Sequence, residues 1–226
     1  MTVQEYLDRH YYTAEQLADY SGVPVTLLES LMAQHLIPRP SYKVAGDILT
    51  SSAFGELDAQ GAKAGSYYHP SSQQWIARAQ SIAGEKAADA LEKFFFVNMA
   101  VELSHLNHRM YRLIDAFDEN GRPLASGLEA RIAGYWQSFL KGIFGLCVAN
   151  PVSEREIAEK EILQEKLTTL TNNGEQCEGI LLSRKELLLL VDQYEASSMP
   201  FSPVEYPISS RKRLVDDLRL KCAQSS

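Results

Sequence analysis

The chain has 226 residues, of which 45% are apolar and 23% charged, and its formal net charge is −7. This composition is typical of a globular protein, and it excludes a disordered, collagen-like or disulfide-rich chain. Acidic residues outnumber basic residues by 29 to 22. The surface as a whole therefore does not suit nucleic acid or anionic lipid, because both attract clustered Lys and Arg.

We expect no signal for export or for membrane insertion in this sequence. The first ten residues contain Glu5 and Asp8 and no apolar run, so we expect no secretory signal. The longest apolar stretches, Phe94–Val101 and Leu187–Val191, are far shorter than the roughly 20 residues that a membrane span needs. The three cysteines are odd in number and widely separated, which fits neither a disulfide framework nor a thiolate metal site. We expect a cytoplasmic protein with reduced thiols.

The first predicted elements are two short helices joined by a tight turn. Thr13-Ala-Glu-Gln16 is typical of a capping box at the start of a helix. Ser21-Gly-Val-Pro24 interrupts that helix, and apolar residues at helical spacing predict a second helix over 25–35. Pro38 must lie outside it, because proline has no amide hydrogen to donate. Residues 1–45 are therefore predicted to form a helix-turn-helix head.

The rest of the chain is predicted to be helical. Residues 46–66 are rich in Gly, Ala and Ser with weak periodicity, and we interpret them as a connector. In the body, residues 67–226, the longest predicted helix covers 85–117 with an apolar residue every three or four positions. No convincing set of alternating strands is present. The sequence predicts an all-α protein, with the head packed on a multi-helix body that has one long central helix.

The segment 11–42 resembles the head of MerR-type transcriptional regulators. The similarity is carried by Tyr12-Thr-Ala-Glu-Gln-Leu-Ala-Asp-Tyr-Ser-Gly-Val-Pro-Val-Thr-Leu-Leu-Glu29 and by the exit His35-Leu-Ile-Pro38. The family has the same Tyr-Thr start, Leu-Ala pair and Gly-Val turn, and a similar exit into a wing. The resemblance implies a DNA-binding head whose second helix is the recognition helix.

The residues of that second helix differ from the family pattern. MerR-type recognition helices carry arginines and paired tyrosines that reach phosphates and base edges. The corresponding positions here hold Thr26, Glu29, Ser30 and Leu31, and residues 1–45 contain three basic and five acidic residues, a net charge of −2. A glutamate in the groove would be repelled by the phosphates. The candidate recognition residues are Thr26, Glu29, Ser30 and Arg39, and we expect them to contact protein rather than DNA.

The whole chain is also similar to a family of uncharacterised bacterial proteins sometimes labelled natural-product biosynthesis. The similarity is carried by Tyr42 and the prolines before it, Tyr68-His-Pro70, Cys147–Pro151 and Ser153–Glu161. This resemblance implies no activity, fold or substrate.

A line of polar residues marks the predicted central helix. Asn98, Glu102, His105 and Arg109 follow one another at steps of four, three and four, so they share one face. They could form a network in which Glu102 faces His105 and Arg109, or an acid/base pair at a small-molecule cavity. A Glu and a His three apart are half of a di-iron carboxylate site, but the second half is missing. Weak metal candidates are Glu102, His105 and His69, and we expect no cofactor.

No common catalytic motif is present. The sequence lacks Gly-x-Gly-x-x-Gly, a phosphate loop, His-Glu-x-x-His, Cys-x-x-Cys and Gly-x-Ser-x-Gly. We predict a non-catalytic accessory or interaction protein whose head is a contact or packing module, with a protein partner or self-association. Two alternatives stay open: a MerR-like regulator that binds DNA through residues 13–42, and a small-molecule binder or enzyme that uses the polar line.

Overall fold

The computed structural model describes residues 1–82, 84 and 86–224, and it combines helices with a five-stranded antiparallel sheet. The prediction of an all-α fold is therefore wrong. The strands lie in the order β1-β5-β2-β3-β4. Their bounds are Tyr12–Thr13 for β1, Tyr42–Ala45 for β2, Ile48–Ser51 for β3, Gly55–Asp58 for β4 and Gly65–Tyr68 for β5.

Strands β3 and β4 and the start of β5 lie in residues 46–66, where the sequence predicted a connector, and β1 and β2 lie in the predicted head. The glycines of this segment predicted a loop, but one of them belongs to a tight hairpin turn. Gly46-Asp47 joins β2 to β3, and Ala45 pairs with Ile48 across this turn. Gly46 has a φ of +58°, a conformation that tight hairpin turns require and that glycine adopts without strain. Tyr42 and Val44 point inward from β2. With at most two buried residues, each strand is too short to show a clear alternating pattern.

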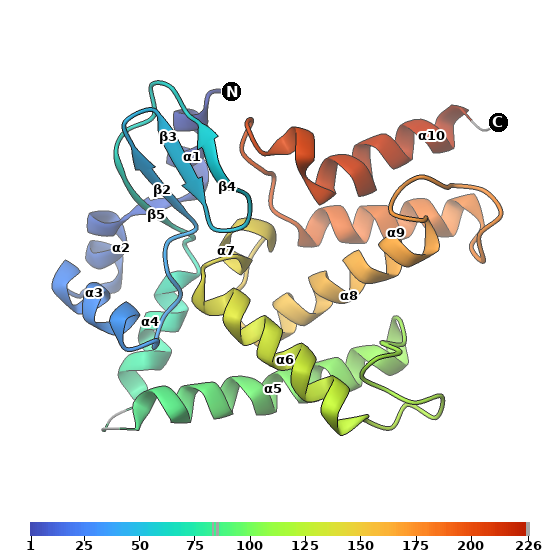
Figure 1. Cartoon of the computed structure of the whole chain (residues 1–226), viewed down its shortest axis with the longest axis horizontal. Helices are drawn as coiled ribbons and strands as arrows, with labels where there is room; N and C mark the ends of the chain where they lie inside the picture. The colour runs from blue at the N-terminus through green and yellow to red at the C-terminus, as the bar shows by residue number, and fades with distance from the viewer. Residues whose placement is uncertain (83, 85, 225–226) are drawn as a thin grey trace.

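Three helices complete the head: α1 (Val3–His10), α2 (Ala14–Ser21) and α3 (Val25–Ala33). The capping box of α2 is confirmed, since the Thr13 hydroxyl accepts from the Gln16 amide at 3.3 Å and the Gln16 side chain accepts from the Thr13 amide at 2.9 Å. In Figure 1, α2 and α3 lie beside the lower end of the sheet, next to α4.

The body is helical, and α5 runs along its base (Figure 1). Helix α5 packs against α6 and α8, but Phe94, Val97 and Val101 on its other face are exposed, so the prediction of a central helix is wrong. The helix also ends at Arg109 rather than at residue 117. Within the described part of the chain, no helix is long and apolar enough to cross a membrane. The body elements are α4 (Ser72–Ser81), α5 (Ala87–Arg109), α6 (Ala125–Leu140), α7 (Phe144–Cys147), α8 (Glu154–Leu170), α9 (Arg184–Ser197), the 3₁₀ helix η1 (Tyr206–Ile208), the π-helix η2 (Lys212–Asp217) and α10 (Leu218–Gln224).

One large hydrophobic core runs through the head and most of the body, and a second, smaller core lies at the C-terminal end. The second core is formed by apolar side chains of α8, α9, η2 and α10, among them Leu167, Tyr194 and Leu218. The head is thus continuous with the body through the main core.

A buried tyrosine cluster joins the head to the C-terminal segment. The Tyr42 hydroxyl donates to the Glu205 carboxylate at 2.6 Å, and the Tyr6 and Tyr42 hydroxyls lie 3.5 Å apart. The Tyr11 hydroxyl donates to the carbonyl of Gly145, in α7, at 3.0 Å. Tyr6, Tyr42 and Glu205 are all fully buried. The head is therefore attached by directed hydrogen bonds as well as by apolar packing.

Tyr42→Phe tests this attachment. The variant removes a hydroxyl donor from a buried carboxylate, so we expect it to lower the free energy of unfolding by about 1–3 kcal/mol. Tyr20→Phe is the matched control because the Tyr20 side chain is 57% exposed, and its effect should stay below about 0.5 kcal/mol. Urea unfolding of both variants measures the difference, and equal losses would contradict the role given to Tyr42.

Candidate functional site

The predicted polar line lies on an open face of α5. Asn98 and Glu102 are half-buried, and His105 and Arg109 are exposed. None of the four lines any of the hollows described below. In the described residues, no group of three or more His, Cys, Asp or Glu side chains could hold a metal ion. The structure therefore places these residues together on one helix face but offers no enclosed site around them.

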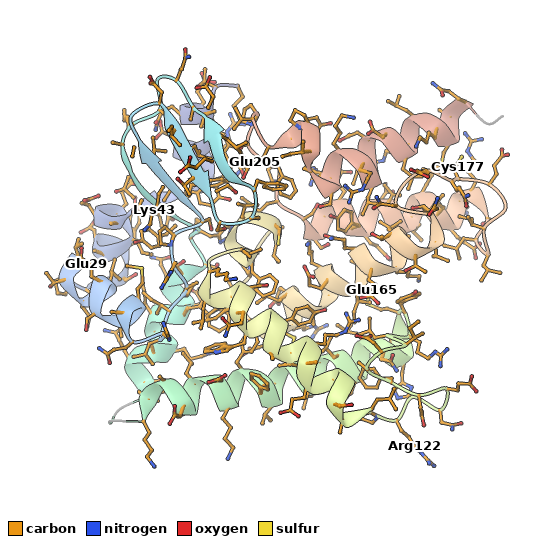
Figure 2. All side chains as sticks on the ribbon, in the orientation of Figure 1. Glu29, Lys43, Arg122, Glu165, Cys177 and Glu205 are labelled. Carbon is orange, nitrogen blue, oxygen red and sulfur yellow. The ribbon has the colours of Figure 1, made fainter. Side chains whose placement is uncertain are left out.

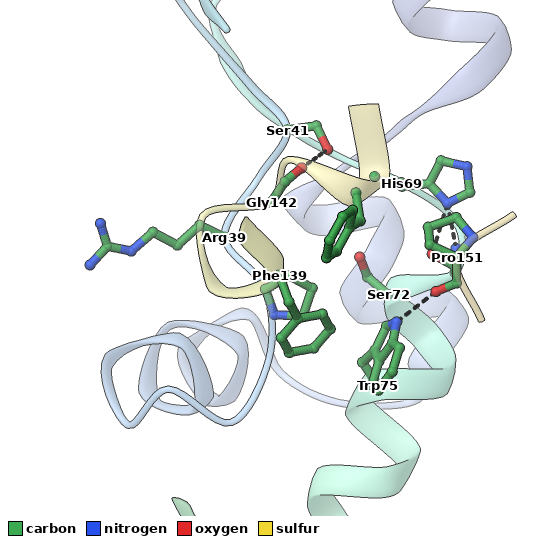
Figure 3. A pocket seen from close by; sticks show the side chains of 12 residues that line it. Arg39, Ser41, His69, Ser72, Trp75, Phe139, Gly142 and Pro151 are labelled. Carbon is green, nitrogen blue, oxygen red and sulfur yellow. Dashed lines mark hydrogen bonds between the residues drawn. The ribbon is translucent and has the colours of Figure 1, made fainter. Parts of the chain in front are cut away.

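His69 lies elsewhere, at a small cavity between the head, α4 and the turn before α7 (Figure 3). The cavity volume of 10 Å³ is about what one water molecule needs. Trp75 donates to the carbonyl of Pro151 at 2.8 Å, and the Ser41 hydroxyl donates to the carbonyl of Gly142 at 2.9 Å. The Arg39 side chain points away from the cavity in Figure 3. The cavity is too small for a substrate.

A serine and a histidine do meet at this cavity. His69 Nδ1 accepts from the Ser71 amide at 3.1 Å and lies 2.8 Å from the Ser71 hydroxyl oxygen. Because Nδ1 accepts from an amide, the ring proton lies on Nε2, the side that hydrogen-bonds the backbone of Ala149. Burial lowers the pKa of His69 to about 4, which makes it a poor general base near neutral pH. We interpret the pair as packing at the start of α4.

An open groove lies between α3 and the sheet, and we call it the head groove. Its volume is 350 Å³. Glu29 lines it from α3 and Lys43 lines it from β2, with Arg39 in the segment between the two elements. Figure 2 shows Glu29 and Lys43 on the same side of the molecule. The groove is lined by Ala14, Val25, Leu28, Glu29, Met32, Ala33, Arg39, Pro40, Lys43, Ser66 and Tyr68.

The walls of the head groove combine apolar surface with opposite charges. The Tyr68 hydroxyl donates to the Met32 sulfur at 3.5 Å, which links β5 to α3. Burial raises the pKa of Tyr68 to about 12, and the carboxylates of Glu29 and Glu15 add to this effect. The phenol is thus neutral, and the fixed charges of the groove are Glu29 on one wall and Arg39 and Lys43 on the other. Such a surface complements a ligand that carries both signs of charge.

A second hollow of 270 Å³ adjoins the head groove at Arg39, which lines both. It is formed where the end of α3 meets α5 and the end of α6. It again carries both signs of charge, since Glu92 lines it together with Arg39 and Lys141. Its lining residues are His35, Arg39, Glu92, Trp136, Gln137, Leu140 and Lys141. Residues of the head and of the body thus line this hollow together.

The structure brings together only part of the predicted recognition surface. Glu29 and Arg39 line the head groove, whereas Thr26 and Ser30 do not. Lys43 and Tyr68 were missed, because their place in the groove depends on the pairing of β2 with β5. The hairpin turn Gly46-Asp47 was the available signal for the first of these strands.

The fold defines a helical body that carries a head made of helices and a sheet. Residues 91–223, more than half of the chain, match a family model described as Family of unknown function (DUF6058). The chain belongs to this family. No curated protein and no solved structure matches the chain. The family match covers most of α5 through α10 and leaves the head groove outside it.

Acid should destabilise the protein through His69. The pKa of this group is lower in the folded chain than its ordinary value of 6.5, so its contribution is complete above about pH 6.5 and is lost as the pH falls toward 4. We expect His69→Gln to remove about 2–3 kcal/mol of the loss in unfolding free energy between pH 7 and pH 4.

His35→Asn is the control, because His35 is exposed and asparagine tolerates its positive φ of 58°. This variant should keep the pH dependence of the parent protein in urea unfolding at both pH values. The interpretation of His69 fails if His69→Gln keeps that dependence too.

Proposed function

We propose that this protein is a non-catalytic interaction protein and that the head groove, with the hollow beside it, binds a protein partner. The observation that carries this proposal is an open groove of 350 Å³ with Glu29 on one wall and Lys43 on the other. Charge of both signs beside apolar side chains suits a polypeptide, which can offer a cation, a carboxylate and an apolar anchor within a few residues.

The attachment of the head to the body supports this function. The Arg39 amide donates to the Leu140 carbonyl at 3.0 Å, and the hydroxyl of Ser41 donates to the Gly142 carbonyl. These bonds fix the segment between α3 and β2 against the end of α6. A groove held in one shape before binding costs less ordering entropy when a partner arrives.

Site-specific photocrosslinking in the source cells tests the proposal. A benzoylphenylalanine at Ala33, which lines the head groove, should give a discrete protein adduct, and the same residue at the exposed Ala130 on α6 should not. Lys43→Glu should lower the yield of that adduct about tenfold, because it reverses a charge in the groove, the equivalent of about 1.4 kcal/mol.

Lys185→Glu is the matched control, since it makes the same charge change at an exposed position on α9. It should leave the adduct unchanged. Equal labelling from positions 33 and 130, or equal loss with both charge variants, would refute binding in the head groove.

A DNA-binding regulator is the second candidate. The arrangement supports it in one respect, because α2 and α3 are followed by the β2–β3 hairpin, and Arg39 and Lys43 lie beside the end of α3. Against it, the exposed side chains on α2 and α3 include Glu15, Asp19 and Glu29, which phosphates would repel.

Fluorescence anisotropy with a random-sequence DNA duplex separates the two candidates. We expect no binding tighter than about 10⁻⁴ M at physiological salt, the weak end of ordinary non-specific binding. The titration should be repeated at low salt with Glu29→Gln, which removes the repelling charge. Micromolar binding by the unaltered chain that weakens steeply with salt would favour the regulator over the protein-contact proposal.

A further inference from the structure

Two cysteines that are far apart in the sequence meet at the C-terminal end of the molecule. Cys177 packs against the second core, and Cys222 is a buried member of that core. The Cys177 side chain is the hydrogen-bond partner of the Cys222 thiol, and neither cysteine is in a disulfide. Cys177 lies in the segment that joins α8 to α9, and Cys222 lies on α10. In Figure 2 the Cys177 label lies beside α10.

Neighbouring contacts keep this segment against α10 and η2. The Lys221 ammonium donates to the Gly174 carbonyl at 2.8 Å. On the other side, Gly174 lies so close to η2 that a Cβ atom there would come within 2.6 Å of the Arg213 carbonyl oxygen. The segment that carries Cys177 is therefore held against both α10 and η2. These contacts keep Cys177 close to the helix that carries Cys222.

The two thiols differ in their access to solvent. Cys177 is half-buried, whereas Cys222 is only 2% exposed and belongs to the second core. Burial and the hydrogen bond to Cys177 raise the pKa of Cys222 to about 11. A reagent in solution thus meets Cys177 first, and Cys222 is the thiol that resolves the product.

We propose that Cys177 and Cys222 form a reversible disulfide when the protein meets a small-molecule disulfide such as oxidised glutathione. The Cys177 thiolate attacks one glutathione sulfur and forms a mixed disulfide, and one glutathione leaves as a thiolate. Cys222 then loses its proton and attacks the Cys177 sulfur, and the second glutathione leaves. Two protein thiols are oxidised, and one glutathione disulfide is reduced to two thiols.

The disulfide between Cys177 and Cys222 would cross-link the second core. It would connect the α8–α9 segment to α10 covalently, at the place where the hydrogen bond from Lys221 to Gly174 and side-chain packing now hold them. Cross-links of this kind stabilise a fold mainly by restricting the unfolded chain. Oxidation should therefore raise the resistance of α10 to proteolysis, and a thiol reductant should reverse this.

Intact-mass spectrometry of the full chain, with oxidised glutathione as the probe, tests the proposal. The expected product has lost two hydrogens and contains one peptide pair joined between Cys177 and Cys222. Cys147→Ser should give the same product, because Cys147 is buried next to α8 rather than near α10.

Single substitutions then test the order of events. Cys222→Ser should retain one glutathione on Cys177, and Cys177→Ser should retain none on the buried Cys222. A mass without the loss of two hydrogens, a bond that includes Cys147, or a disulfide formed only between two chains would overturn the proposal. Equal glutathione adducts on both single variants would overturn the assigned order of attack.

Discussion

Glu205 is a fully buried carboxylate, and the arrangement of the head depends on how it is satisfied. Its Oε2 atom accepts from the hydroxyls of Tyr42 and Ser202, both at 2.6 Å, and its Oε1 atom has no partner in the part of the chain that the structure describes. A buried carboxylate is costly unless donors surround it. The segment before η1 and strand β2 therefore have to meet at this point.

The same cluster determines where the head groove lies. Tyr42 is paired with Tyr67 across β2 and β5, so fixing Tyr42 also fixes the strand that carries Tyr68 into the groove. Tyr11 connects the cluster to Gly145 and hence to the body. The position of the groove therefore depends on the hydrogen bonds that attach the head to the body, and this attachment supports the proposal that the head is a contact surface.

Local features of the fold could be predicted from the sequence, because they depend on neighbouring residues. The capping box at Thr13 forms as the residue types indicate, and Ser183 and Glu186 form another at the start of α9. The inward stripe of α5 is also correct in Leu91, Phe95 and Met99, which are buried. The end of α5 was misjudged because the Asn107 side chain accepts from the Leu113 amide at 3.0 Å and turns the chain early.

Features that join distant residues could not be predicted in the same way. The sheet needs β5 to pair with both β1 and β2, and nothing local to residues 65–68 indicates either partner. The contact between Cys177 and Cys222 has the same origin, since it depends on α10 lying beside the α8–α9 segment. The polar line on α5 shows the opposite case, in which correct helical spacing places residues on one face without creating a site.

Hydrogen exchange of Glu205→Ala against the unaltered protein tests most directly whether Glu205 holds the head in place. We expect faster amide exchange in α1 and β2, because the tyrosine cluster loses its acceptor, and unchanged exchange in the second core between α8 and α9. Exchange that stays slow in β2, or that rises equally in the head and in the second core, would contradict a head held in place by Glu205.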